Sequence, residues 1–225
     1  MQENKKGFRR DMADLVHDMR SPITAIYGSA DVLLDGKVDS ADYPKYLRLI
    51  KKEAERLNRM VGDMLSAEKL SEGRVHLNKT RFNLTEAVRL VLLGMEAAIE
   101  AKALQVELFA EECFVYGDEA LITEVISCLL ENAVKYTPNG QSLLLSVINE
   151  GDSVRFALKN TGVSISADDL PHIFDRFYRC ADDEKGTGLG LYIAKGILDL
   201  HDSTLSAESE EGKYCLFSFC LPLRP

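Results

Sequence analysis

His17 and Asp18 have the side chains and the spacing that a nucleophile and its base require. His17 lies two positions from Leu15 and two from Met19. Each such step turns a helix by about 200°, so the imidazole is expected to point away from the apolar stripe into solvent. Asp18 can hold the ring tautomer and take a proton, which leaves the other ring nitrogen as the nucleophile. Alone, an exposed histidine without a role is the simpler interpretation, so the surrounding elements must decide.

A second group of polar side chains shares one face of a helix predicted at residues 118–136. Asn132, Lys135 and Tyr136 are spaced i, i+3 and i+4, whereas the apolar residues of the same segment face a core. An amide oxygen suits Mg²⁺, an ammonium suits phosphate, and an aromatic ring packs against a nucleoside. The three side chains together therefore suit a Mg-nucleotide. The plainer interpretation is that Asn132 caps a turn and Lys135 is merely solvated.

Glycines open a later helix, predicted at residues 189–201. The run Gly186, Thr187, Gly188, Leu189 and Gly190 leads directly into it. Glycines at a helix start let backbone N–H groups approach phosphate, and the positive end of the helix dipole favours the negative charge. A single glycine-rich segment is a weak indication of a phosphate site. The indication gains strength here because the segment follows the helix that carries Asn132, Lys135 and Tyr136 on one face.

The histidine is expected on one arm of a helical hairpin. Residues 35–40 predict a turn, with Gly36 at a C-cap position and Pro44 in the first turn of the next helix. Two helices cannot enclose a core alone, so two copies are expected to pair into a four-helix bundle. Apolar residues step by three and four along both arms, at Phe8, Met12, Leu15, Met19, Pro22, Ile26, Ala30 and Leu33, and at Tyr43, Leu47, Ile50, Ala54, Leu57, Val61 and Met64.

Beyond residue 73 the pattern changes to alternating helices and strands. Helical periodicity covers 84–102, 118–136 and 189–201, and this predicts a mixed α/β layer with helices against a sheet. Strand-like runs lie at 106–109, 143–149, 154–159, 205–208 and 214–221.

Composition and charge exclude several classes of function. The chain has 225 residues, 46% of them hydrophobic, and no run approaches the roughly 18 apolar residues of a membrane span. Its net charge of −9 divides into +1 over residues 1–75 and −10 over residues 76–225, an acidic body that repels nucleic acid. Five cysteines without a CxxC pair argue against a zinc site or a disulfide framework and for a reducing compartment.

Four segments, in order, carry a resemblance to one protein family. The residues 17–22 closely resemble the phosphoacceptor box of sensor histidine kinases. The helix at 121–136 resembles the N box of the ATP-binding fold shared by histidine kinases, gyrases, Hsp90 and MutL. The segments 173–179 and 186–191 resemble the F and G2 boxes of that fold. The resemblance covers essentially the whole chain and implies a dimerisation and phosphotransfer domain at 1–75, an all-α hairpin, followed by an α/β two-layer sandwich that binds ATP at 76–225.

The resemblance also implies an activity and partners. ATP with Mg²⁺ would bind near Asn132, the metal ligand, and would phosphorylate His17, with Asp18 as the base. Ser21 lies where the family often positions a water for dephosphorylating the partner, and Arg179 is the candidate for reaching a terminal phosphate. The phosphoryl group would pass to an aspartate on a response-regulator receiver domain. The implied protein is a homodimer in the cytoplasm that meets a membrane only through a sensor region outside this chain.

The sequence departs from the family at the G1 box, where Asp-x-Gly-x-Gly is usual and Asn160-Thr161-Gly162-Val163-Ser164 stands here. The usual aspartate accepts from the adenine 6-amino group. Asn160 can accept through its oxygen, without charge assistance, or can offer its NH₂ to the 6-oxo group of guanine, and the sequence leaves both open. The segment between Arg179 and Gly186 is also shorter than is usual in the family.

Two rival functions remain at this stage. The altered G1 box and the short lid are compatible with a degenerate kinase that binds nucleotide weakly and acts as a phosphatase or scaffold. A nucleotide-dependent switch of the ATPase kind is disfavoured, because Cys128 occupies the position of the water-activating glutamate, four residues before Asn132. A thiol there cannot serve as the general base for water.

Overall fold

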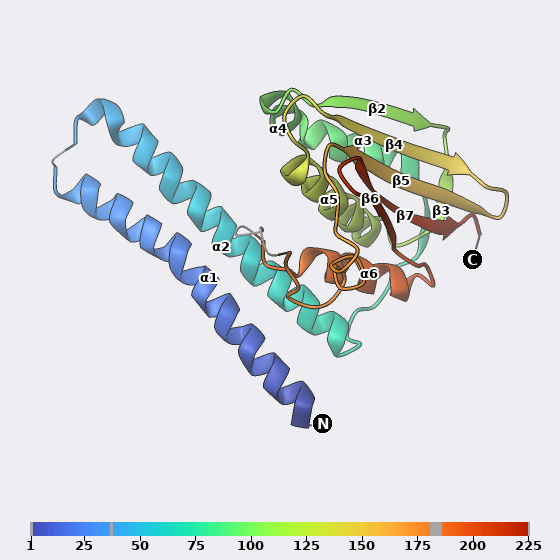
Figure 1. Ribbon diagram of the computed structural model, residues 1–225, viewed down its shortest axis with the longest axis horizontal. Helices are drawn as coiled ribbons and strands as arrows, with labels where there is room; N and C mark the ends of the chain where they lie inside the picture. Colours follow the sequence, from blue (N-terminus) through green and yellow to red (C-terminus); the bar gives the residue numbers. More distant parts are fainter. Residues whose placement is uncertain (1, 37, 181–185, 225) are drawn as a thin grey trace.

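A helical hairpin forms the N-terminal part of the molecule (Figure 1). The computed structural model describes residues 2–36, 38–180 and 186–224, with side chains from residue 18 onward. Helix α1 (Gln2–Leu34) and helix α2 (Tyr43–Ser71) are joined through a short 3₁₀ turn, η1 (Ser40–Asp42). Gly36 has φ +64°, as the predicted C-cap requires, and a proline lies in the first turn of α2. The backbone of His17 belongs to α1, while its side chain lies outside the described part.

Helix α2 has two apolar faces, where the sequence predicted one stripe. Met60 and Ala67 are buried towards the α/β part, and a Cβ on Gly196 of the last helix would lie 3.2 Å from Leu70. The predicted positions Leu47 and Val61 are exposed. The periodicity of three and four fits either face, so the sequence alone could not separate them.

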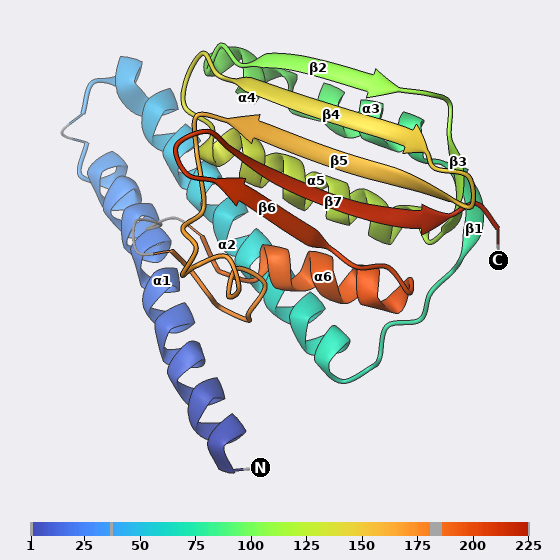
Figure 2. The same cartoon turned by 45° about the vertical axis from the view of Figure 1, so that its right-hand side comes forward.

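The rest of the chain is a two-layer α/β sandwich (Figure 2). A five-stranded sheet has the order β2-β4-β5-β7-β6; β2 is parallel to β4, and the other pairs are antiparallel. The elements are β1 (Thr80–Asn83), α3 (Leu84–Gly94), α4 (Glu96–Ala101), β2 (Gln105–Ala110), β3 (Phe114–Gly117), α5 (Glu119–Tyr136), β4 (Ser142–Asn149), β5 (Ser153–Thr161), α6 (Gly190–Leu200), β6 (Ser206–Glu210) and β7 (Tyr214–Pro222). The predicted hairpin followed by an α/β sandwich is confirmed.

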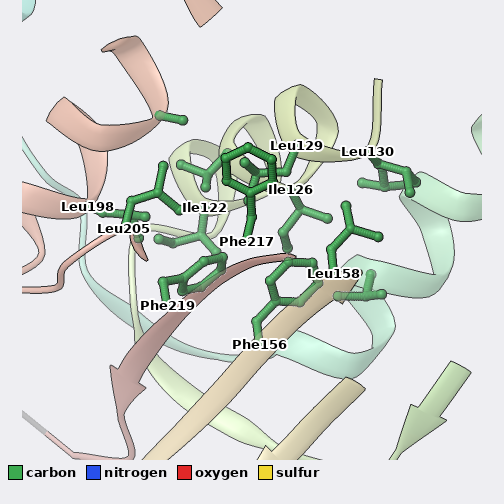
Figure 3. Packing of buried hydrophobic residues seen from close by; sticks show 14 of the residues in the cluster. Ile122, Ile126, Leu129, Leu130, Phe156, Leu158, Leu198, Leu205, Phe217 and Phe219 are labelled. Carbon is green, nitrogen blue, oxygen red and sulfur yellow. The ribbon is translucent and has the colours of Figure 1, made fainter. Parts of the chain in front are cut away.

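The core lies between helix α5 and the inner face of the sheet (Figure 3). Ile126 and Leu129 are fully buried against Phe156 of β5, whose ring stacks on Phe219 of β7 at a centroid distance of 5.0 Å. Burial of this size, about 1.5–3 kcal/mol for each large apolar side chain, holds the apolar face of α5 against the sheet. The opposite face of α5 is therefore presented away from the sheet.

The sequence missed two features of the α/β part. The predicted helix at 84–102 is broken at Met95, where φ −107° and ψ 2° end α3 and begin α4. Strands β1 and β3 pair as a separate two-stranded sheet of four residues each. Runs this short carry too few residues to show a period of two. Among the described residues, no helix combines the length and apolar character needed to cross a membrane.

Candidate active site

The start of helix α5 is fixed by a network around its N-cap. The Asp118 side chain accepts from the backbone N–H groups of Leu121, at 3.2 Å, and Asn78, at 2.8 Å. The backbone N–H of Asp118 donates to Nε2 of His201, at 2.9 Å, and Nδ1 of that histidine lies 2.8 Å from the Ile197 carbonyl. Nε2 must accept, so the neutral ring carries its proton on Nδ1 and ties the start of α5 to the end of α6.

A cavity of about 700 Å³ lies between α2 of the hairpin and α5. Basic side chains of α2, which sequence reasoning missed, form one wall: Lys52, Arg56 and Arg59 are spaced i, i+4 and i+7 and so share a helix face. That spacing was the available signal. Residues predicted from the sequence line the cavity as well, namely Asp18, Asn132, Lys135, Tyr136, Gly186, Thr187, Gly188 and Gly190.

Asn132 and Cys128 occupy successive turns of α5. The Asn132 amide nitrogen lies 3.9 Å from the Cys128 sulfur, which orients the amide oxygen away from the thiol. Burial, with the Glu131 and Asp63 carboxylates adding to it, raises the pKa of Cys128 to about 12. The thiol stays protonated at neutral pH and cannot take a proton from water. The Lys135 ammonium donates to the Tyr136 hydroxyl at 2.7 Å.

Asn160, near the end of β5, is buried, and its amide orientation is set by neighbours. The Thr137 hydroxyl donates its only proton to the Ala133 carbonyl, at 2.6 Å, so its oxygen must accept from the Asn160 NH₂, at 3.1 Å. The Asn160 oxygen consequently points away from Thr137. Asn160 does not line the cavity. Gly162 has φ +74°, and a Cβ there would lie 2.8 Å from the Gln141 side chain.

The segment between β5 and α6 closes on itself. Phe177 and Gly188 both have positive φ, 64° and 67°, and the Phe177 N–H donates to the Gly188 carbonyl at 2.9 Å. A Cβ on Gly188 would lie 2.5 Å from the Phe177 carbonyl carbon, so only glycine fits. Leu189 is fully buried in the core, which leaves only its backbone to serve the site. Residues 181–185 of the short lid lie outside the described residues.

Two side-chain contacts tie this segment to the hairpin. Arg179 donates to the Asp18 carboxylate at 2.6 Å, and the Thr187 hydroxyl donates to the Asp63 carboxylate at 3.3 Å. The Asp18 and Arg179 side chains are mostly buried, which strengthens a charge-assisted hydrogen bond. Ser21, one turn along α1 from Asp18, is exposed. The structure thus brings the neighbour of His17 and the Arg179 segment together.

Two family models cover most of the chain. The His Kinase A (phospho-acceptor) domain matches residues 9–73, and the histidine kinase-, DNA gyrase B-, and HSP90-like ATPase matches residues 117–225. The sensor histidine kinase CusS of Escherichia coli O6:H1 is 30% identical over 202 residues, and WalK of Bacillus subtilis is 30% identical over 232 residues.

The chain belongs to the two-component sensor histidine kinases.

Solved histidine kinases share the fold. The crystal structure of ThkA in complex with the response regulator TrrA matches with a TM-score of 0.77 and 27% identity, over 99% of this chain and 64% of that one. Acinetobacter baumannii AdeS matches in fold with a TM-score of 0.73 and 24% identity, over 92% and 98% of the two chains. The CusS match covers 88% of this chain and 42% of CusS, and the WalK match covers 99% and 38%, so the chain spans less than half of these relatives.

In this kinase, the stability of the contact between α2 and α5 depends on pH, because carboxylates lie at that contact. Burial raises the pKa of Asp63, with Glu131 adding to the increase, and burial likewise raises the pKa of Glu124, with Asp63 adding to it. An acid whose pKa is raised in the folded state stabilises that state when protonated, and this stability is lost as the pH rises through the raised pKa. The packing of α2 against α5 should therefore become more stable as the pH falls towards these pKa values.

Asp63→Asn is the variant that tests this pH dependence. It keeps an acceptor for Thr187 and removes the charge. We expect it to raise the thermal midpoint by about 2–4 °C at neutral pH, and by less at a pH below the raised pKa of Asp63, where the carboxyl group is itself protonated. Asp42→Asn, an exposed carboxylate of η1, is the matched control. An equal gain at both pH values would show that the charge of Asp63 does not oppose the contact.

Proposed function

We propose that this chain is the phosphotransfer and ATP-binding core of its kinase, which phosphorylates His17 from Mg-ATP and passes the phosphoryl group to a response-regulator aspartate. The observation that carries the proposal is the cavity, whose walls combine Asp18, the neighbour of His17, with Asn132 and the Gly186–Gly190 segment. Residues 1–75 would form the dimerisation and phosphotransfer domain, and residues 76–225 the ATP-binding domain.

The residues present suit a Mg-nucleotide. The Asn132 oxygen points away from Cys128 and would hold Mg²⁺, which would neutralise phosphate charge. Lys135 and the backbone N–H groups of Gly186–Gly190 would bind phosphates, with Tyr136 beside the nucleoside. The Asn160 oxygen, together with the backbone at Gly162, would take the adenine.

The transfer step places specific demands on the charged groups. A neutral imidazole nitrogen of His17 attacks the γ-phosphorus, the bond to the β,γ-bridging oxygen breaks, and ADP leaves. Asp18 holds the other ring nitrogen and accepts its proton. The Asp18 carboxylate is paired with Arg179 in this structure. Transfer therefore requires Arg179 to exchange Asp18 for the terminal phosphate, which frees the base and neutralises the transferring group in one movement.

A second copy and a receiver domain are the proposed partners. Apolar side chains of the hairpin are exposed at Tyr27, Leu34, Leu47 and Leu65, and pairing with a second hairpin would bury them in a four-helix bundle. The ThkA structure contains a bound response regulator, and its similarity to this chain supports such a partner here. Ser21 lies exposed on α1, where it could serve the dephosphorylation of that partner. The five free cysteines support a reducing, cytoplasmic setting.

The test is phosphorylation with γ-labelled ATP and Mg²⁺, followed by acid and base treatment of the labelled protein. A phosphorus–nitrogen bond is labile in acid and stable in base, so the label should be lost in acid only and should move to a receiver domain. An acid-stable label would place the phosphoryl group on a hydroxyl and overturn the proposal. The alternative of a degenerate kinase is not favoured, because the N-box residues line the cavity together with the glycine segment.

The fixed amide of Asn160 predicts base selectivity. Its NH₂ donates to Thr137, which leaves its oxygen to serve as the acceptor for the adenine 6-amino group. This favours the first of the two hypotheses left open by the sequence. We expect ATP to bind more tightly than GTP by about tenfold, because the 6-oxo group of guanine and the Asn160 oxygen are both acceptors and cannot form a hydrogen bond with each other. Asn160→Asp should increase the affinity for ATP by about tenfold through charge assistance.

Competitive titration of ATP and GTP against both proteins measures this selectivity. Asn149→Asp makes the same chemical change at an exposed position at the end of β4 and should leave both affinities unchanged. If the wild-type chain binds GTP as tightly as ATP, the Asn160 oxygen is not the group that reads the base.

A further inference from the structure

The C-terminal end of helix α5 leaves carbonyl groups without their usual partners. In a continuing helix, the N–H of residue 138 would donate to the carbonyl of Val134. Pro138 has no N–H, and the helix ends at Thr137, whose φ −65° and ψ 127° are extended. The Val134 carbonyl therefore loses its helical donor, and the last carbonyl dipoles of α5 converge at this end. The end of α5 also carries Lys135 and Tyr136, which belong to the proposed nucleotide site.

The ammonium of Lys102 supplies the missing donors. Its Nζ lies 2.7 Å from the Val134 carbonyl, 2.8 Å from the Lys135 carbonyl and 2.8 Å from the Thr137 carbonyl. An ammonium has three N–H donors, and all three are used here. Its positive charge also lies at the negative end of the helix dipole, where it is favourable.

Lys102 is itself held in place by the backbone. It follows α4 directly, and its carbonyl accepts from the N–H of Gly140 at 2.9 Å. The next contact along the chain is the N–H of Gln105, which donates to the Gln141 carbonyl at 2.9 Å. Two backbone hydrogen bonds thus join the loop between α4 and β2 to the loop that follows α5.

Thr137 connects these hydrogen-bonded loops to Asn160, the residue proposed to bind the base. Its carbonyl is bound by Lys102, and its hydroxyl sets the orientation of the Asn160 amide. The N–H and the hydroxyl of Thr137 also donate to the Ala133 carbonyl, so a change at Lys102 would remove one of three hydrogen bonds that hold this residue. Loss of that bond would loosen the Thr137 carbonyl, and with it the geometry that directs the Asn160 oxygen. The contacts run from the Lys102 ammonium through Thr137 to the Asn160 amide, and neither Lys102 nor Thr137 belongs to a motif that the sequence singled out.

We propose that Lys102 is a positioning residue for purine recognition, holding Thr137 so that the Asn160 oxygen faces the 6-amino group of the base. The inference rests on the proposed function, in which Asn160 takes the adenine. Lys102 touches no nucleotide in this scheme and acts only through Thr137.

The test compares two nucleotides that differ only in the 6-amino group: ATP and purine riboside triphosphate, which lacks it. Dissociation constants are measured for the full chain and for Lys102→Met, which keeps the side-chain length and removes the donors. The wild-type chain should prefer ATP by about tenfold, the value of one lost hydrogen bond with an unpaired acceptor left behind. In Lys102→Met the preference should fall to within about twofold. Lys79→Met removes another partly buried ammonium, paired with Asp202 at 3.6 Å, and should keep the preference.

A purely structural role would give a different result. Lys102→Met would then lower the thermal midpoint and weaken both nucleotides by the same factor, leaving the tenfold preference intact, and this would overturn the inference. Should that variant not fold, Lys102→Arg serves in its place: a planar guanidinium cannot meet three converging carbonyls, so a reduced preference is expected and an unchanged one contradicts the inference. Failure of the wild-type chain to bind ATP at all would instead contradict the proposed function.

Discussion

Replacing His17 with alanine is expected to abolish the incorporation of phosphate from ATP, a loss of more than about a thousandfold. His17 is the residue before Asp18, whose carboxylate lines the cavity and is bonded to Arg179. Without the imidazole there is no nitrogen to accept the phosphoryl group, and the neighbouring side chains cannot replace it. Because the ring is expected to point off the apolar stripe, nucleotide binding and thermal stability should stay within error of the wild-type chain.

His76→Ala is the matched control for this experiment. His76 is exposed in the loop between α2 and β1, away from the cavity, and its replacement removes an imidazole without touching the site. We expect full labelling of His76→Ala and none of His17→Ala, measured from the same ATP concentration with acid lability checked for each. Undiminished labelling of His17→Ala would place the phosphoryl group on another residue and remove the basis of the proposed function.

The sequence was sufficient to predict those parts of the molecule that depend on residues close together in the chain. Apolar periodicity located the hairpin, α5 and α6, because an amphipathic helix repeats its pattern over several turns. The turn at Gly36 and the glycine segment before α6 were also found from local residue types. These features depend on residues within a few positions of each other, which is the range that a single sequence displays.

Features that depend on long-range packing were missed. Lys102 meets its three carbonyls from more than thirty positions away, and nothing near it in the sequence indicates an ammonium at a helix end. The pairing of Asp18 with Arg179 likewise joins positions 161 residues apart. The orientation of the Asn160 amide could not be predicted either, since it depends on where the single proton of Thr137 goes.

Gly188→Ala should be the most damaging substitution among the glycines whose surroundings the structure describes, with a loss of phosphorylation rate on the order of a hundredfold. Two costs combine at this position. The backbone is left-handed, with φ +67°, which costs a non-glycine residue about 1–2 kcal/mol. The new Cβ would also lie 2.5 Å from the carbonyl carbon of Phe177 and 2.8 Å from its Cα, and backbone atoms cannot move aside as a flexible side chain can.

Gly212→Ala separates these two costs. Gly212 has φ +68°, almost the same backbone conformation, yet nothing lies within 4 Å of its Cβ position. Both variants should lose a few degrees of thermal midpoint from the backbone alone. Only Gly188→Ala should also displace Phe177, and with it Arg179 two residues later, which pairs with Asp18 and is proposed to reach the terminal phosphate. We therefore expect Gly212→Ala to phosphorylate within about threefold of the wild-type rate. Equal rates for the two alanine variants would mean that the contact between Gly188 and Phe177 does not position Arg179 for phosphorylation.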